Sequence, residues 1–189
     1  TINVLADNAT VNNSDVLDFG SALQNTTVTK TVQIKNTGTP NLIISRVKVA
    51  GDAFSITTLQ DDTLAFNEKT ELTLNFEPTT EGAQEGSLTI LSNAANSSAF
   101  SVTLTGSSFA DGEVLPIANA RQLELGTRVT VAGRVTVANQ FGGPLYMQDG
   151  TAGIAVFWSD LHENVEIGDS VQVSGPLSVF NPIPGPESD

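Results

Sequence analysis

The sequence predicts an all-β protein made of two modules, a β-sandwich followed by a small β-barrel. Short segments with an apolar residue at every second position recur along the 189-residue chain, and this period is typical of strands with one buried face. Clusters of glycine, proline and asparagine separate the segments, as turns require. No apolar run approaches the ~20 residues of a membrane-spanning helix, so we expect no membrane span.

The first module, residues 1–108, contains five segments that predict strands with one apolar face. The segments are TKTVQIKN, NLIISRVKV, ELTLNFEP, GSLTILSN and AFSVTLTG, and their inward residues are Val32, Ile34, Leu42, Ile44, Val47, Val49, Leu72, Leu74, Phe76, Leu88, Ile90, Phe100, Val102 and Leu104. Strands of this kind bury their apolar faces by packing face to face, which predicts the sandwich. The apolar parity switches at Ser45-Arg46, which predicts a β-bulge there.

The order of several short motifs in this module resembles the Hydin-like, major-sperm-protein-like immunoglobulin family. The motifs are the DFG start, the KNTG turn, the FEP block with its following EG, G, L and I, and the LTG end, and together they span residues 18–106. The resemblance implies an immunoglobulin-like sandwich. It also implies a spacer or interaction domain without enzymatic activity, of the kind found in exported bacterial proteins of the choice-of-anchor type.

The second module, residues 113–189, predicts a strongly curved β-barrel. Its segments are RVTVAGRVTVANQ, PLYMQDGTAGIAVFW and VEIGDSVQVSG, and glycines at 133, 142–143, 150 and 168 interrupt them. Glycine inside a strand marks a bend or a bulge. The polar stretch SSFADGE at 107–113 separates this module from the first and predicts the domain boundary.

These segments resemble, over residues 116–181, the bacterial OB-fold domains found beside secreted nucleases and phosphoesterases. Such a domain closes its barrel with a fifth strand. Here the chain runs instead into NPIPGPESD, whose prolines are unsuited to a central strand. We therefore expect an OB-like barrel that is incomplete at its last strand, either because the chain is truncated or because another segment closes it.

Strand alternation also assigns the two faces of the predicted barrel. The inward residues are Val129, Val131, Val135, Val137, Leu145, Met147, Ile154 and Val156, and the outward residues are Arg128, Thr130, Arg134, Thr136, Tyr146, Gln148, Ala155 and Phe157. Ligands of OB folds usually bind the outer face of the second and third strands, where aromatic rings stack on bases or sugars. The predicted ligand-binding residues are Arg134, Tyr146, Gln148, Phe157 and Trp158.

A simpler interpretation assigns these aromatic residues a packing role. Tyr146 and Phe157 would then cover a short helix or loop near residues 159–165, or pack against the first module. Trp158 fits a rim anchor and a core plug equally well.

The sequence offers no recognisable catalytic or metal-binding motif, and we expect neither a catalytic residue nor a cofactor. His162 is the only histidine and has no partner motif for nucleophilic catalysis. There is no cysteine, which excludes thiolate metal sites. Asp149-Gly150-Thr151 predicts a turn, with calcium binding by Asp149 as the alternative, and Asp61-Asp62 predicts a loop pair.

The charge argues against a general binder of polyanions. The chain carries 8 basic and 21 acidic residues, for a net charge of −13, and both modules are acidic, whereas nucleic-acid affinity rests largely on cationic neutralisation of phosphate. This excess of acidic residues fits a protein that is exposed to the extracellular medium. No basic and apolar leader opens the sequence, so we expect a fragment or a mature form.

We therefore hypothesise a non-catalytic accessory or binding segment of a larger exported or cell-surface bacterial protein. Its expected partners are neighbouring domains of that protein and a nucleic acid or a carbohydrate. One alternative is a module that binds single-stranded nucleic acid through Arg134, Tyr146 and Phe157. Another is the accessory region of a secreted nuclease or phosphoesterase whose catalytic domain lies outside these residues.

Overall fold

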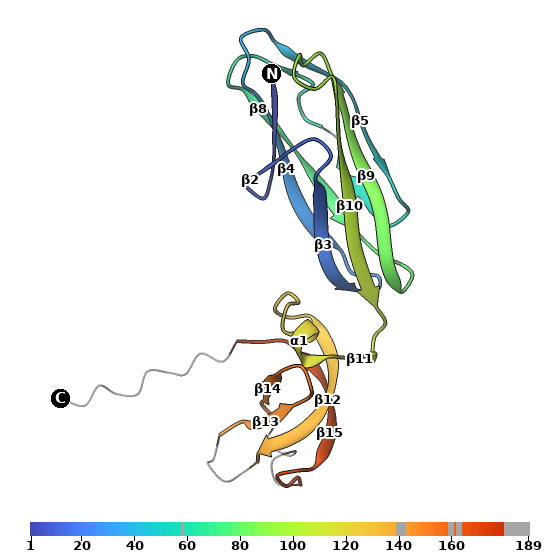
Figure 1. Ribbon diagram of the computed structural model, residues 1–189, viewed down its shortest axis with the longest axis vertical. Helices are drawn as coiled ribbons and strands as arrows, with labels where there is room; N and C mark the ends of the chain where they lie inside the picture. The colour runs from blue at the N-terminus through green and yellow to red at the C-terminus, as the bar shows by residue number, and fades with distance from the viewer. Residues whose placement is uncertain (58, 139–142, 159–160, 162–163, 180–189) are drawn as a thin grey trace, which may run out of the picture. The chain divides into compact units, whose positions relative to one another are not determined.

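A computed structural model describes residues 1–57, 59–138, 143–158, 161 and 164–179. The described residues form three five-stranded sheets (Figure 1), which confirms the predicted all-β class. The chain divides into two compact units, residues 1–110 and 111–189. Across the described ranges, no helix has the length and apolar character needed to span a bilayer.

The first unit is a sandwich of two sheets. The strands of one sheet, in spatial order, are β2 (Ala9–Val11), β1 (Ile2–Ala6), β4 (Val28–Asn36), β8 (Lys69–Phe76) and β6 (Phe54–Ile56). Those of the other are β3 (Val16–Leu23), β10 (Ala99–Phe109), β9 (Gly82–Ser92), β5 (Leu42–Ala50) and β7 (Thr63–Leu64).

The five strands expected in this unit are β4, β5, β8, β9 and β10, and their predicted inward residues form its core. All of these residues are buried except Val47 and Val49, which are half-buried and pack against the core. The register of β5 against β9 shifts between Ile44 and Arg46, which confirms the predicted bulge. Phe76 stacks on Phe54 at 5.0 Å between ring centroids and fills the space between the sheets.

Asn36 is the last residue of β4 and belongs to the KNTG motif. Its side chain is polar but fully buried. Its Nδ2 donates to the carbonyl oxygens of Pro40 at 2.9 Å and Leu64 at 3.0 Å, and its Oδ1 accepts from the Gly38 N–H at 2.9 Å. A buried amide is tolerated when its hydrogen bonds are made in this way. The motif thus joins the end of β4 to the following loop and to β7.

In the residues that the structure describes, the second unit is a single curled sheet accompanied by the short helix α1. Its elements are β11 (Val114–Leu115), α1 (Ile117–Ala120), β12 (Arg128–Val137), β13 (Leu145–Gln148), β14 (Gly153–Val156) and β15 (Ser170–Pro176). The long strand β12 pairs antiparallel with β13 along one edge and with β15 along the other, and β14 pairs with β13. The helix was not predicted from the sequence.

Most predicted inward residues of this unit are buried in a common core, among them Val129, Val131, Val135, Leu145 and Met147. The inward placement of Val137 was wrong. The register of β12 against β13 shifts between Val135 and Val137, so that Val137 pairs with the outward Tyr146 and Ala138 is buried instead.

Thr130 differs from the other outward residues of β12 because it is buried. Its hydroxyl forms a 2.7 Å hydrogen bond with the hydroxyl of Ser174 on β15, and β11 pairs alongside it through Val114. The buried Thr130 is therefore closed to a ligand, which narrows the part of the outer face that a ligand can reach.

Candidate functional site

The five predicted site residues fall into three places on the second unit. Arg134 and Gln148 are register partners on β12 and β13 and line one surface hollow. Phe157 and Trp158, 54% and 52% exposed, follow β14 and line a different hollow. Tyr146 is 44% exposed and lines neither. The five side chains therefore do not converge on one platform: two line the first hollow, two line the second, and Tyr146 lies outside both.

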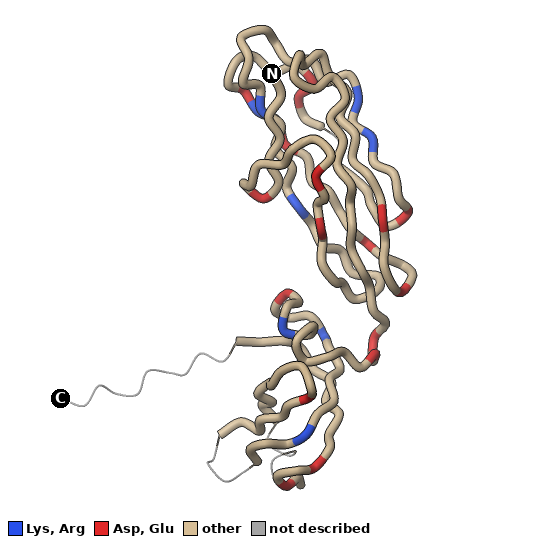
Figure 2. Tube along the Cα trace, viewed as in Figure 1, with Lys and Arg blue, Asp and Glu red and all other residues tan. Residues whose placement is uncertain are grey.

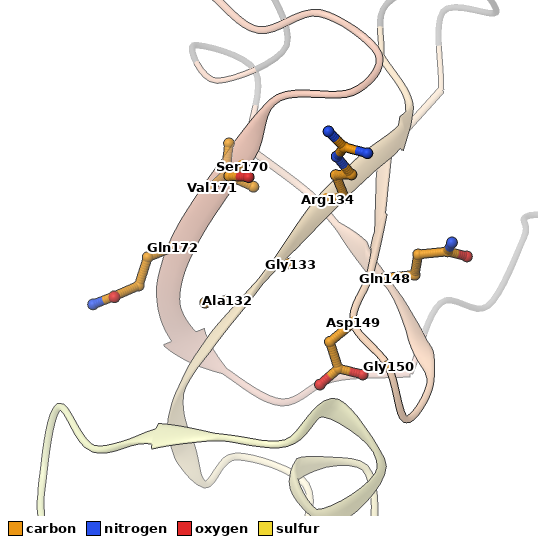
Figure 3. Close-up of a pocket in the computed structure, with 9 residues that line it drawn as sticks. All are labelled: Ala132, Gly133, Arg134, Gln148, Asp149, Gly150, Ser170, Val171 and Gln172. Atoms are coloured by element: carbon orange, nitrogen blue, oxygen red, sulfur yellow. The ribbon is translucent and has the colours of Figure 1, made fainter.

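The first surface, here called the polar hollow, is lined by residues 132–134, 148–150 and 170–172 and has a volume of about 660 Å³. Its floor is made of the small residues Ala132 and Gly133, and the longer side chains of Arg134, Gln148 and Gln172 lie around it (Figure 3). The hollow is therefore shallow, with hydrogen-bonding groups at its rim.

Gly133 explains why a hollow forms at this place. A Cβ on this residue would lie 2.5 Å from the carbonyl oxygen of Gln148 and 2.8 Å from its carbonyl carbon, distances at which atoms overlap. Glycine lets β13 approach β12 this closely, a known role of glycine within strands. With Ala132 next to it, the middle of the surface carries almost no side-chain bulk.

Strand register brings three kinds of polar group into one row. Arg134 on β12 pairs with Gln148 on β13 and, across its other edge, with Ser170 on β15. Paired residues point to the same face of a sheet, so the side chains that carry a guanidinium, an amide and a hydroxyl start from neighbouring positions on three adjacent strands. Gln172 occupies the next row, opposite Ala132.

Figure 2 shows Lys and Arg in blue and Asp and Glu in red along the chain. Among the residues that line the polar hollow, Arg134 is the basic one. Its Nε donates a 3.0 Å hydrogen bond to the carbonyl oxygen of Gly168, which fixes the direction of the guanidinium. Among the described residues, no partner is recorded for its two terminal nitrogens. Since a guanidinium carries five N–H donors, Arg134 retains donors for a ligand.

Asp149 adopts the turn that the sequence predicted. Its Oδ2 accepts from the Ile117 N–H at 2.8 Å, and its Oδ1 accepts from the Thr151 N–H at 2.7 Å, the Thr151 hydroxyl at 2.6 Å and the Ala152 N–H at 2.9 Å. These bonds, led by that from Ile117, hold the pKa of the Asp149 carboxyl far below its ordinary value. The carboxylate thus joins the β13–β14 turn to the start of α1.

Both Asp149 oxygens are engaged in this turn, which leaves the calcium alternative without support from the geometry. Within the described ranges, no three histidine, cysteine, aspartate or glutamate side chains gather as a metal site would require. His162 and most of residues 159–165, where a loop or short helix was expected, lie outside the described residues.

Replacing Asp149 with asparagine should make the stability of the second unit less dependent on pH. A carboxyl with a depressed pKa stabilises the fold fully above the unfolded pKa of about 3.9, and that contribution is lost as the pH falls toward the folded pKa. We expect D149N to unfold at a lower temperature than wild type at pH 7 and the difference to shrink below pH 4. Thermal unfolding from pH 7 to pH 2 measures this, with the exposed Glu124→Gln as control. A constant difference at every pH would contradict the assignment.

The second surface, here called the apolar groove, has a volume of about 420 Å³ and is lined by residues 129, 131, 154–158 and 173–178. Most of these side chains are aliphatic or aromatic, and they come from β12, from β14 and the two residues after it, and from β15 and the two residues after it. Phe157 and Trp158 supply exposed aromatic surface to it.

Sequence reasoning missed Ser170 and Gln172, which complete the polar hollow. Their alternation with Val171 and Val173 marks them as outward residues of a strand. Their place beside Arg134 depends on the pairing of β15 with β12, and a single sequence does not reveal which strands pair.

Comparison with known proteins identifies the first unit. A family model described as HYDIN/CFA65/VesB-like, Ig-like domain matches residues 9–107, more than half of the chain. Similar solved structures include a protein of unknown function from Porphyromonas gingivalis W83, with 16% identity and a TM-score of 0.46. The match covers 55% of this chain and 46% of that one.

Two proteins of Vibrio cholerae are also similar. The VesB protease has 13% identity and a TM-score of 0.41, with 50% of this chain and 30% of that one covered. The secreted serine protease VesC has 11% identity and a TM-score of 0.43, with 87% of this chain and 43% of that one covered. The chain thus spans less than half the length of each of these three proteins, and no curated protein matches it. On the strength of the family match over residues 9–107, the chain belongs to the HYDIN/CFA65/VesB-like family of immunoglobulin-like domains.

Proposed function

We propose that this chain is a non-catalytic accessory segment of a larger exported or cell-surface bacterial protein, and that its second unit binds a carbohydrate in the polar hollow. The immunoglobulin-like unit serves as a spacer or interaction domain, which its family membership supports. The second unit has the form of an open OB-like barrel. The proposed binding role rests mainly on one observation: Arg134, Gln148 and Ser170 form a row across three adjacent strands.

The chemistry of this row suits a ligand rich in hydroxyl groups. A sugar hydroxyl both donates and accepts, and the row offers guanidinium donors, an amide with both functions and a hydroxyl with both functions. Tyr146 lies on the same outward face of β13 as Gln148, two residues away, and the residue is 44% exposed. An exposed aromatic ring of this kind gives the apolar face of a sugar ring a surface to pack on.

The charge of the second unit disfavours a nucleic acid as the ligand. Residues 111–189 contain three basic and ten acidic residues, a net charge of −7. Arg128 forms a 3.6 Å ion pair with Asp111, so little basic surface remains to neutralise phosphates. Because affinity for nucleic acids depends on that neutralisation, a neutral polymer fits the surface better.

A binding panel tests this proposal directly. We expect the chain to be retained by glycans of an array and not by single-stranded oligonucleotides at about 50 mM salt. Arg134→Ala should weaken glycan binding about tenfold or more, since a hydrogen bond from a charged group contributes roughly 1.5–3 kcal/mol.

Arg128→Ala is the matched control, because Arg128 is also an exposed arginine of β12 but lies outside the polar hollow. Oligonucleotide binding that is sensitive to salt and lost in Tyr146→Ala would establish the nucleic-acid alternative instead. Absence of binding to either class would overturn the binding role.

A further inference from the structure

The first unit has a broad outer face on the sheet that contains β3, β10, β9 and β5, which lie side by side (Figure 1). Serine and threonine occupy the middle of this face, and charged residues lie toward its two ends. We propose that the chain forms a two-fold symmetric dimer in which this face packs against the same face of a second copy. The dimer is separate from the polar hollow and does not depend on carbohydrate binding.

Strand register places the outward side chains of this sheet in rows. Thr89 of β9 pairs with Ser101 of β10, and Ser87 pairs with Thr103. The hydroxyls of Thr89 and Ser101 form a 3.3 Å hydrogen bond, which shows that they project from the same face, whereas Leu88 points the other way and is buried. The middle of the face therefore carries short, uncharged side chains, which let a second sheet approach to about 10 Å, the distance at which sheets pack.

Basic side chains lie toward one end of the face. Arg46 and Lys48 are exposed, and Val47 between them packs against the core, so both basic side chains point outward. Arg46 pairs with Leu91 of β9, and Lys48 pairs with Thr89. In the part of the chain that the structure describes, no ion pair is recorded for either cation, so both can meet an acidic partner.

Acidic side chains lie toward the other end of the face. Glu85 of β9 and Asp18 of β3 both pair with Thr105 of β10, and the Thr105 hydroxyl donates to Oδ1 of Asp18 at 3.2 Å. Glu85 precedes Thr89, the register partner of Lys48, by four residues, or about 13 Å in an extended strand. Because the Debye length is about 8 Å at physiological ionic strength, attraction between the two ends of one copy is largely screened.

A two-fold axis lying between two such faces brings the basic end of each copy onto the acidic end of the other. The contact is made twice, because both partners use the same surface. The same rotation joins exposed apolar residues. Leu91, 36% exposed, lies beside Arg46 at the basic end. Val16, 61% exposed, lies two residues from Asp18 on the same strand at the acidic end. The face is thus complementary to itself in charge and in apolar surface, which favours a second copy as its partner.

The size and charge of the face set the expected affinity. Four strands about 4.8 Å apart and roughly eight residues long, at about 3.3 Å per residue, present about 500 Å². A stable interface buries about 800 Å² of each partner, and the net charge of −13 on each chain opposes association. We therefore expect a weak dimer, with a Kd between about 10 μM and 1 mM.

Sedimentation equilibrium at about 0.15 M salt tests the proposal. Between about 10 μM and 1 mM protein, the apparent mass should rise from that of a monomer toward that of a dimer. A chain that stays monomeric throughout this range would overturn the proposal and leave the face to a different occupant.

Charge reversal tests the pairing itself. The variant Arg46→Glu/Lys48→Glu makes both ends of the face acidic, and Asp18→Lys/Glu85→Lys makes both ends basic. Each variant alone should associate at least tenfold more weakly than wild type, because like charges then face each other. An equimolar mixture should regain association as a heterodimer, since both contacts are complementary again, and this recovery also shows that both variants are folded.

A second pair of variants avoids Asp18, which also accepts a 3.0 Å hydrogen bond from the Gly20 N–H. Lys48→Glu and Glu85→Lys should each weaken association, and their mixture should restore it. Lys35→Glu is the matched control, because it changes the net charge as Lys48→Glu does but lies on β4 in the other sheet. Equal weakening by Lys35→Glu, association that the variants leave unchanged, or a mixture that associates no better than its components would overturn the proposal.

Discussion

Replacing Asn36 with alanine is expected to lower the free energy of unfolding of the first unit by about 2–4 kcal/mol. The change removes three hydrogen bonds made by a fully buried amide. It leaves the carbonyls of Pro40 and Leu64 and the N–H of Gly38 without this partner in a place that the substitution does not open to water. Unsatisfied buried groups of this kind are more costly than the loss of an exposed hydrogen bond.

Urea unfolding followed through the amide NMR signals of each unit measures this effect. The signals of the first unit should lose intensity at lower urea in N36A, while those of the second unit, which has a core of its own, should be unchanged. Asn41→Ala is the control, because Asn41 is exposed and lies in the loop just before β5. Equal stability of N36A and N41A would show that the KNTG amide does not hold the loop to the sandwich.

Replacing Gly133 with valine is expected to destabilise the second unit by about 3 kcal/mol, the upper end of the usual range for over-packing. The new Cβ would lie 2.5 Å from the Gln148 carbonyl oxygen. This oxygen belongs to the backbone of a paired strand and cannot rotate away as a flexible side chain could. We expect β13 to separate from β12, and the row of Arg134, Gln148 and Ser170 to be lost with it.

The methyl signal of Met147 reports on this change, because Met147 is the chain's single methionine and is fully buried in the core of the second unit. In G133V this signal should broaden or move at a lower temperature than in wild type, and glycan binding should disappear. Gly175→Val is the control, since a Cβ on Gly175 in β15 meets no atom within 4 Å. A stable G133V that retains glycan binding would contradict the account of how the hollow forms.

The strands and core of the first unit could be predicted because burial leaves a direct mark on the sequence. Leu72, Leu74 and Phe76 alternate with polar residues, and only one pleated arrangement buries all three. The bulge in β5 was also predictable, because the apolar parity changes at Ser45-Arg46. The bulge in β12 was not, because Thr136 and Val137 both suit either face of a strand and no parity change marks it.

The candidate site could be predicted only in part, since it depends on register. Arg134 and Gln148 were identified as outward residues from their own strands, but their pairing with each other and with Ser170 follows from the contacts between strands. Because strand pairing could not be predicted, Phe157 and Trp158 were grouped with Arg134 and Gln148, although they line the apolar groove. The sequence of one strand reports which way a side chain points, and not which strand lies next to it.

The most direct test of the binding role is an NMR titration of the ¹⁵N-labelled chain with the glycan that it retains best. The account predicts chemical-shift changes at residues 132–134, 148–150 and 170–172, which line the polar hollow, including the Nε–H of Arg134. In Arg134→Ala the changes at the remaining residues should need about tenfold more glycan to reach the same size. Changes confined to the first unit, or changes in these residues that persist unaltered in Arg134→Ala, would contradict it.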